Sequence, residues 1–194
     1  KDIFHAPSGD ITTEFMNQSN AGATYYWGEN FSAASLGLEE SGTMWFILPD
    51  EGKTTADVLN GGAYGEMISS GSGEEGWQNK KYMKVNLSVP KFDISAQADL
   101  KEGLQAMGIT DIFNFETADF TQALEGPACI TGANQSLRVA IDEKGVTAAA
   151  YIEIPGAGAA APPEEIIDFI LDRPFLFVIT SSGIPLFAGA VNQP

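Results

Sequence analysis

Short apolar segments alternate with polar turns along most of the chain, and this pattern predicts a protein built mainly from β-strands. Six segments rich in β-branched and aromatic residues, each bounded by Gly, Asn or Pro, are typical of strands: Thr24–Trp27, Thr43–Leu48, Lys84–Phe92, Leu137–Ile141, Pro174–Thr180 and Pro185–Val191. Residues 175–179 and 186–190 are almost continuously apolar, which predicts strands covered on both faces. Ser181-Ser182-Gly183 between them has the composition of a tight hairpin turn.

Helical pattern is scarce. Apolar residues at i, i+4 and i+7 predict one helix over residues 100–107, and Gly108 is placed to end it. Thr54 or Thr55 can cap a second helix over residues 56–59. The predicted fold class is therefore α+β with strands dominant, and 194 residues is about the length of one domain.

The charge balance excludes whole classes of partner. Ten Lys and Arg residues stand against 26 Asp and Glu residues, which gives a net charge of −16. Such a chain repels the phosphates of nucleic acids and the surface of anionic membranes, so neither is an expected partner. No apolar run approaches the roughly 20 residues of a membrane-spanning helix, so no membrane insertion is expected either.

The residues that carry catalysis and metal binding are few. His5 is the single histidine and lies in a polar segment without a nucleophile motif, so we interpret it as an ordinary surface histidine. Cys129 is the single cysteine, which excludes an internal disulfide and predicts a buried, unreactive thiol. The adjacent carboxylates at 39–40, 74–75 and 164–165 are interpreted as solvated charge. We therefore expect no enzymatic activity, no metal and no cofactor.

Residues 142–163 are the most informative stretch of the sequence. Alternate residues from Val146 to Ile154 are apolar, so they form one apolar face of a strand. Residues 155–163 consist of Gly, Ala and Pro only and are typical of an exposed loop. From composition alone, this stretch is either an edge strand followed by a linker or a strand that can be both exposed and inserted into a sheet.

The neighbouring motifs distinguish these two interpretations. Residues 139–150, VAIDEKGVTAAA, resemble the hinge of the serpin family of protease inhibitors, and residues 172–179, DRPFLFVI, resemble the strand after the family's reactive loop. Residues 186–194, LFAGAVNQP, are similar to the family's closing strand. Further motifs of the family occur upstream in the expected order, at residues 44–52, 89–92, 107–113 and 118–120. The resemblance runs through essentially all 194 residues.

The resemblance implies an inhibitor in which the target protease supplies the catalysis. The reactive loop, residues 143–163, is offered as a substrate, the protease forms an acyl-enzyme, and the cleaved loop inserts into the large sheet before deacylation. The implied hinge comprises Glu143, Lys144, Gly145, Val146, Thr147, Ala148, Ala149 and Ala150. Thr147 departs from the usual Glu, and Gln135 stands where many animal members carry a His.

The resemblance also implies where the loop is cleaved. In the family the cleaved bond lies about fourteen residues beyond the hinge glycine, which gives Ala159–Ala160, with Gly158 or Ala161 as alternatives. These residues are small, so they fill a shallow primary pocket without a void, whereas an Arg-selecting or deep aromatic pocket is left unsatisfied. The expected targets are therefore elastase-like and subtilisin-like serine proteases.

The motifs correspond to the C-terminal half of a single serpin domain, over residues 1–194. The expected partners are the target protease and the N-terminal half of the domain, which a separate polypeptide could supply. Strong acidity and the lack of disulfides favour a bacterial-type member that is secreted or lies at the cell surface. The alternatives are a non-inhibitory serpin and a β-rich surface-binding module without a protease target.

Overall fold

The computed structural model describes residues 1–38, 42–70, 76–142 and 163–194. These residues form two compact units. The first unit comprises Lys1–Phe92 and Ala140–Pro194, and the second comprises Asp93–Val139. No helix in these described ranges is long and apolar enough to cross a membrane.

Strands outnumber helices among the described residues. The strands are β1 Asp2–Ala6, β2 Gly9–Thr13, β3 Phe15–Trp27, β4 Phe31–Gly37, β5 Gly42–Pro49, β6 Lys80–Pro90, β7 Phe92–Asp99, β8 Asn134–Ile141, β9 Ile166–Ile170, β10 Phe175–Ser181 and β11 Ile184–Val191. The helices are α1 Thr55–Gly61, α2 Ala63–Ser70, α3 Lys101–Ala106 and the 3-10 turn η2 Asp111–Phe113. The predicted strand-dominated α+β class is confirmed.

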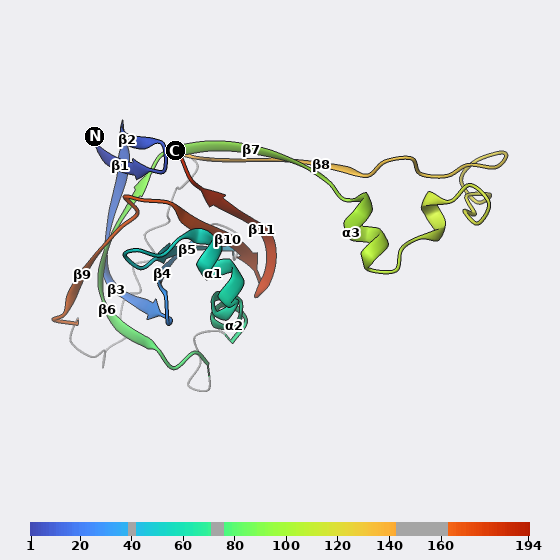
Figure 1. Ribbon diagram of the computed structural model, residues 1–194. Helices are drawn as coiled ribbons and strands as arrows, with labels where there is room; N and C mark the ends of the chain where they lie inside the picture. Colours follow the sequence, from blue (N-terminus) through green and yellow to red (C-terminus); the bar gives the residue numbers. More distant parts are fainter. Residues whose placement is uncertain (39–41, 71–75, 143–162) are drawn as a thin grey trace. The chain divides into compact units, whose positions relative to one another are not determined.

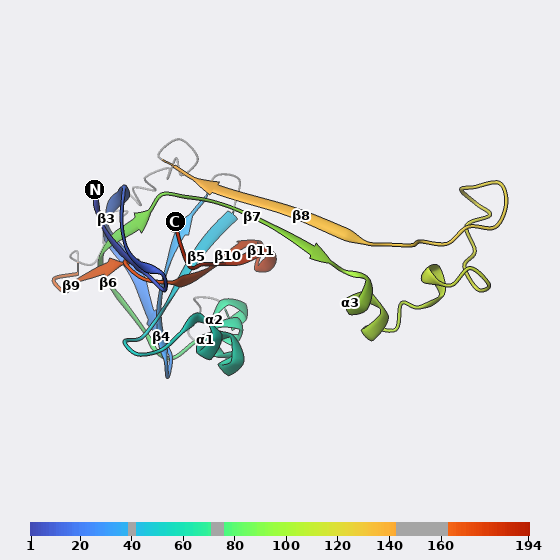
Figure 2. The same cartoon turned by 45° about the horizontal axis from the view of Figure 1, so that its top comes forward.

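Seven strands of the first unit form one sheet in the order β11-β10-β5-β4-β3-β6-β9, and β1 and β2 form a separate hairpin (Figures 1 and 2). Neighbouring strands of the sheet are antiparallel except β6 and β9, which run parallel. Ser182 and Gly183 join β10 to β11 with φ values of 50° and 79°, and two positive φ values are typical of a type I′ turn. The predicted hairpin is confirmed.

The centre of this sheet is apolar on both faces. Consecutive residues of β5 and β10 point to opposite sides, and nearly all of them are apolar. On one face, α1 and α2 cover the strands, and the helix residues Val58 and Met67 are fully buried against Trp45 and Val178 (Figure 1). On the opposite face the buried rings of β5, β7 and β10 contact one another at centroid distances of 5.6 to 6.2 Å. The predicted burial of residues 175–179 on both faces is confirmed, with Ile179 half-buried.

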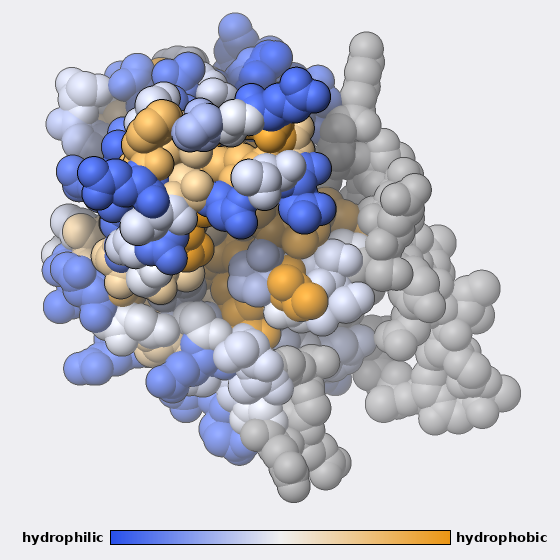
Figure 3. Space-filling model, turned by 90° about the vertical axis from the view of Figure 1, so that its right-hand side faces the viewer, coloured by the Kyte–Doolittle hydropathy of each residue, from blue (hydrophilic) through white to orange (hydrophobic). Residues whose placement is uncertain are grey.

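The edge strand β11 corrects the prediction that residues 186–190 are covered on both faces. Ile184, Leu186 and Phe187 expose 64%, 56% and 42% of their surface. Leu186 and Phe187 are consecutive, so their side chains face opposite sides of the sheet. β11 lies at the sheet edge with β10 as its neighbour among the described strands, and both side chains remain exposed. One face of the molecule, seen in Figure 3, has hydrophobic side chains open at the surface among hydrophilic ones. Apolar sequence in this strand is therefore not matched by burial within the described residues.

The second unit has no buried core of its own. It holds most of the β7–β8 ribbon, and α3 and η2 lie between these two strands along the chain (Figure 2). No residue from 93 to 139 is among the buried hydrophobic residues, and Met107 and Phe115 expose 78% and 61% of their surface. The predicted helix ends before Gly108, which has φ of 89°, but it buries none of its residues.

Helix α1 begins and ends as its sequence predicts. The Thr54 hydroxyl oxygen accepts a hydrogen bond from the backbone N–H of Asp57 at 3.2 Å, and the Asp57 carboxylate accepts one from the N–H of Thr54 at 2.8 Å. The hydrogen bonds from Thr54 lower the pKa of the Asp57 carboxyl. Gly62 ends the helix with φ of 71°.

Candidate functional site

The predicted hinge, residues 143–150, and the predicted reactive bond at Ala159–Ala160 lie outside the described residues. Pro163, at the end of the predicted loop, is described, as are the two flanking strands. β8 ends at Ile141 and β9 begins at Ile166. These two strands flank the candidate site along the chain, and we call them its frame in that sense only.

Strand β8 leads into the segment, and one of its edges pairs with no other described strand. Leu137 and Val139 are half-buried and Ile141 is buried, while Arg138 and the other intervening residues are exposed, as on a strand with one covered face. Among the described strands β7 is the sheet partner of β8, and the opposite edge of β8 has no partner among them. This edge can accept a further extended segment.

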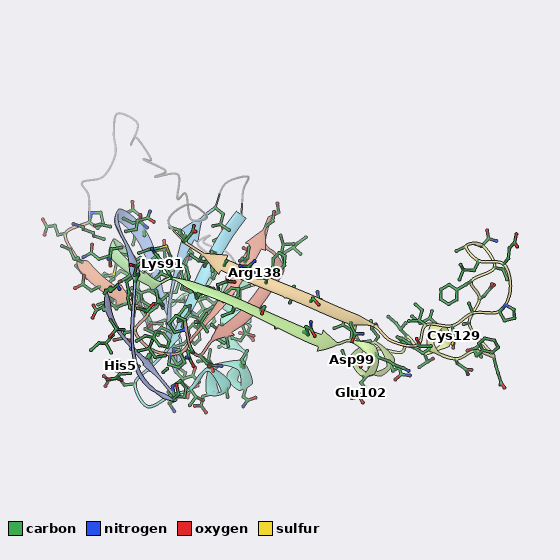
Figure 4. All side chains as sticks on the ribbon, turned by 90° about the horizontal axis from the view of Figure 1, so that it is seen from above. His5, Lys91, Asp99, Glu102, Cys129 and Arg138 are labelled. Carbon is green, nitrogen blue, oxygen red and sulfur yellow. The ribbon has the colours of Figure 1, made fainter. Side chains whose placement is uncertain are left out.

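An ion pair joins β8 to β7, and Figure 4 labels its arginine, Arg138. Arg138 donates two hydrogen bonds to the Asp93 carboxylate, from Nε at 2.8 Å and from Nη2 at 2.6 Å. Arg138 lowers the pKa of the Asp93 carboxyl, and the carboxylate raises the pKa of the guanidinium. Because both side chains are more than half exposed, the pair contributes little to stability and acts mainly on strand register.

Ile141, the last residue of β8, lines a cavity of the first unit. Ile141 is 5% exposed, and the cavity has a volume of about 390 Å³. Its lining comes from β3, β4, β5, β6 and β8 and comprises Phe15, Met16, Asn17, Gln18, Leu36, Phe46, Leu87, Val89 and Ile141. The N-terminal end of the segment is thus anchored at a buried, largely apolar position.

Strand β9 receives the other end of the segment. It pairs in parallel with β6, and hydrogen bonds of 2.9 Å from Lys84 N–H to the Glu165 carbonyl and from Leu171 N–H to the Ser88 carbonyl extend this pairing at both ends. The Lys81 ammonium donates to both oxygens of the Glu165 carboxylate at 2.7 and 2.6 Å. Glu165 is thus tied to β6 by both its backbone and its side chain.

The connection from β9 to β10 is tied to two other parts of the first unit. The Arg173 guanidinium donates to the Pro49 carbonyl at 3.0 and 3.3 Å, which joins the connection to the end of β5. The backbone N–H of His5 donates to the carbonyl of Asp172 at 2.6 Å, which joins it to β1. Asp172 and Arg173 of the Asp-Arg-Pro motif therefore tie the chain that follows the segment to β1 and to the end of β5.

His5 is exposed on strand β1, as its sequence context predicts. Its Nδ1 lies 2.7 Å from Oδ1 of Asp10, the residue paired with it across the β1–β2 hairpin. This hydrogen bond, together with the charge of Asp10, raises the pKa of His5. In the described ranges no group of three or more His, Cys, Asp or Glu residues could hold a metal ion.

Cys129 corrects a second prediction. Its thiol is free but half-buried rather than buried, because the second unit, to which it belongs, has no core that could enclose it (Figure 4). Of the adjacent carboxylates, 39–40 and 74–75 lie outside the described residues. Glu164 and Glu165 are exposed, and the ion pair of Glu165 with Lys81 was not predicted.

Strand β9 is the functional element that sequence reasoning missed. It was not among the predicted strands, although the apolar run of residues 166–170 directly after the proline-rich loop gave a usable signal. Asp168 interrupts this run, yet it lies on the exposed face, where it accepts a hydrogen bond from Asn86 Nδ2 at 2.7 Å. The period-2 pattern of β9 is therefore that of a half-covered edge strand.

Comparisons with known proteins agree on one family. A family model described as "Serpin (serine protease inhibitor)" matches residues 1–194. Among curated proteins, the chain is 34% identical to the glia-derived nexin of Mus musculus over 159 residues, which is 80% of this chain and 38% of that protein. It is also 34% identical to plasminogen activator inhibitor 1 of Neovison vison, over 78% of this chain and 36% of that protein.

Solved structures give the same fold. The thermophilic serpin tengpin in its native state matches with a TM-score of 0.73 and 26% identity, covering 100% of this chain and 49% of that one. Native protease nexin-1 with heparin matches with a TM-score of 0.74 and 27% identity, covering 100% of this chain and 51% of that one. The chain thus spans about half the length of these solved relatives, and by the family match over its whole length it belongs to the serpin family.

Proposed function

We propose that this chain is the C-terminal, loop-bearing half of an inhibitory serpin domain that traps serine proteases which cleave after small residues. The observation that carries the proposal is the frame around residues 143–162. The segment links β8, which has an unpaired edge among the described strands, to β9, which is hydrogen-bonded into a seven-stranded sheet. Membership of a family described as serine protease inhibitors supports the same function.

In the proposed mechanism this chain supplies the substrate and the receiving sheet edge, and the protease supplies the catalytic nucleophile. The nucleophile attacks the carbonyl of Ala159, and Ala160 leaves as the new N-terminus, with Gly158 or Ala161 as the neighbouring alternatives. The hinge from Glu143 to Ala150 then enters the sheet beside β8. Because Val146 and residues 148–150 are uncharged and small, their entry into a sheet interior carries little desolvation cost.

The proposed partner besides the protease is the N-terminal half of the domain. The second unit buries no core, and residues 184–188 of β11 are exposed, so both lack covering layers in the described residues. The solved relatives are about twice as long as this chain, which is the length needed to supply such layers. We further propose a secreted or cell-surface protein. The curated relatives above are mammalian, so the bacterial-type assignment rests on acidity and the single cysteine alone.

The experiment tests the complete domain, in which residues 1–194 are joined or mixed with the N-terminal half. Incubation with elastase is expected to give a covalent complex that survives SDS, whereas trypsin gives none. Val146→Arg or Ala148→Glu places an unpaired charge in the inserted strand and is expected to convert the inhibitor into a substrate. Thr147→Glu, on the opposite face of the same strand, is the matched control and is expected to inhibit normally.

Three results would contradict the proposal. Cleavage by elastase without complex formation would favour a non-inhibitory serpin or a binding module. Full stoichiometric inhibition by Val146→Arg would exclude loop insertion. New N-termini found by mass spectrometry only at positions outside Ala159, Ala160, Ala161 and Pro162 would exclude the assigned reactive bond and its alternatives.

A further inference from the structure

One exposed surface lies on the strand that directly follows the reactive loop. On β9, Ile166, Asp168 and Ile170 face the same side, and the register Lys84↔Ile166 places Lys84 and Asn86 of β6 on that side too. We call these five residues the β6–β9 outer surface. Ile166 and Ile170 expose 59% and 42% of their surface, while Phe169 between them is buried on the inner side.

Hydrogen bonds hold the polar part of this surface in place. Asn86 Nδ2 donates to Asp168 at 2.7 Å, and the Ser19 hydroxyl of β3 donates to Asn86 Oδ1 at 2.8 Å. Beside them, the Lys81 ammonium is paired with the Glu165 carboxylate. The two exposed isoleucines therefore sit on a rigid background, which lowers the entropy that a partner must remove on binding.

The length of chain between the reactive bond and β9 limits where a bound protease can lie. Ile166 lies six positions after Ala160 in the chain, and six extended residues span at most about 20 Å. A protease domain of some 220 residues has a radius of gyration of about 17 Å, so its surface extends well beyond that tether. A protease that holds the Ala159–Ala160 bond must therefore lie close to the start of β9.

We propose that the β6–β9 outer surface is a second contact site for the target protease, separate from its active-site cleft; this inference rests on the proposed function. Ile166 and Ile170 would contact an uncharged, apolar patch beside the protease's cleft. The charges of Lys84 and Asp168 offset each other, so this surface itself does not repel acidic groups of the protease. The net charge of −16 on the chain attracts a basic protease over a longer range. The site selects among proteases that share a small primary pocket.

The test measures inhibition of elastase by the complete domain. The variant Ile166→Ser/Ile170→Ser is expected to lower the second-order association rate constant about tenfold while the inhibitor-to-protease stoichiometry stays unchanged. Ile184→Ser, an equally exposed isoleucine on β11 at the far end of the sheet order, is the matched control. Thermal unfolding of each variant verifies that the fold is retained. The rate constant for elastase cleavage of a free peptide of residues 143–163 gives the reference for a loop that lacks the β6–β9 outer surface.

The outcomes separate this inference from the proposed function. An association rate constant within twofold of the unsubstituted protein, or one lowered equally by Ile184→Ser, overturns the second contact site. A raised stoichiometry at an unchanged rate also overturns it, because the isoleucines would then act on loop insertion. If elastase cleaves the unsubstituted protein without forming a complex, the proposed function fails, and the contact site is then tested by the rate of that cleavage. Equal second-order rate constants for cleavage of the domain and of the free peptide would overturn the contact site.

Discussion

Replacing Gly189 with alanine is predicted to destabilise the protein by about 1–3 kcal/mol through overpacking. A Cβ atom at this position of β11 would lie 2.7 Å from both Cε1 and Cζ of Phe177, the residue paired with it on β10, whereas ordinary contacts begin at 3.4 Å. The ring cannot move outward freely because Phe177 is 2% exposed and lies 5.6 Å from the ring of Phe92. The position is glycine because a buried ring occupies the space of its side chain.

Urea unfolding measures the effect, and two variants test its cause. Gly37→Ala, in β4, is the control, since its Cβ meets nothing within 4 Å and the change is expected to stay within about 0.5 kcal/mol. In the double variant Gly189→Ala/Phe177→Leu the smaller side chain leaves room, so the destabilisation is expected to fall short of the sum by about 1 kcal/mol or more. A neutral Gly189→Ala, or additive effects in the double variant, would refute the packing explanation.

Three further outcomes are expected. Thr54→Ala removes the N-cap of α1 and is expected to cost about 1 kcal/mol in thermal unfolding, whereas Thr54→Ser keeps the hydroxyl and most of the stability. In an NMR titration of His5, Asp10→Asn is expected to return the raised pKa toward 6.5; an unchanged pKa would contradict the assigned partner. Because the folded pKa of His5 is raised, its stabilising contribution is complete below pH 6.5 and is lost as the pH rises through the folded pKa. Residues 1–194 expressed alone are expected to be oligomeric or poorly soluble; a monodisperse monomer that melts cooperatively would contradict the half-domain proposal.

The sequence predicted elements whose signal is local. The hairpin at Ser182-Gly183 needs two positive φ values, and helix α1 carries its cap and its terminating glycine within a few residues. The central strands β5 and β10 were predicted because a run of apolar, β-branched and aromatic residues suits a strand covered on both faces. In each case the residues that decide the structure lie inside the element.

The missed elements depend on residues far away in the chain. β4 contains Ala33 and Ala34, whose low strand propensity hides a strand that is buried between β3 and β5. The exposure of β11 was also not predicted. Its apolar sequence indicates that its side chains favour burial, but it does not show whether the described chain has residues that bury them. The position of the candidate site stays a prediction from its motifs. The anchoring of β9 by Lys81 and Asn86 was not predicted, since these contacts join residues more than 80 positions apart.

The burial pattern of β8 also bears on the register that the loop would take if it inserts beside β8 as proposed. Its half-buried face carries Leu137, Val139 and Ile141, all at odd positions. If residues 142–145 form the connection, Ile141 lies opposite Val146 and Val139 lies opposite Ala148, so the apolar faces of both strands coincide. A shift by one residue would instead place Thr147 on the apolar face, which is unfavourable.

This register gives the last prediction, tested in a Cys129→Ser background of the complete domain. Directly paired residues of antiparallel strands have Cα atoms about 4.5–5.5 Å apart, which a disulfide can bridge. Val139→Cys/Ala148→Cys is therefore expected to form a disulfide after elastase has cleaved the loop and not before, as read by mass spectrometry without reduction. Val139→Cys/Thr147→Cys is the control, because its thiols point to opposite faces of the sheet. A disulfide in the control and none in the test pair would place the loop one residue out of this register.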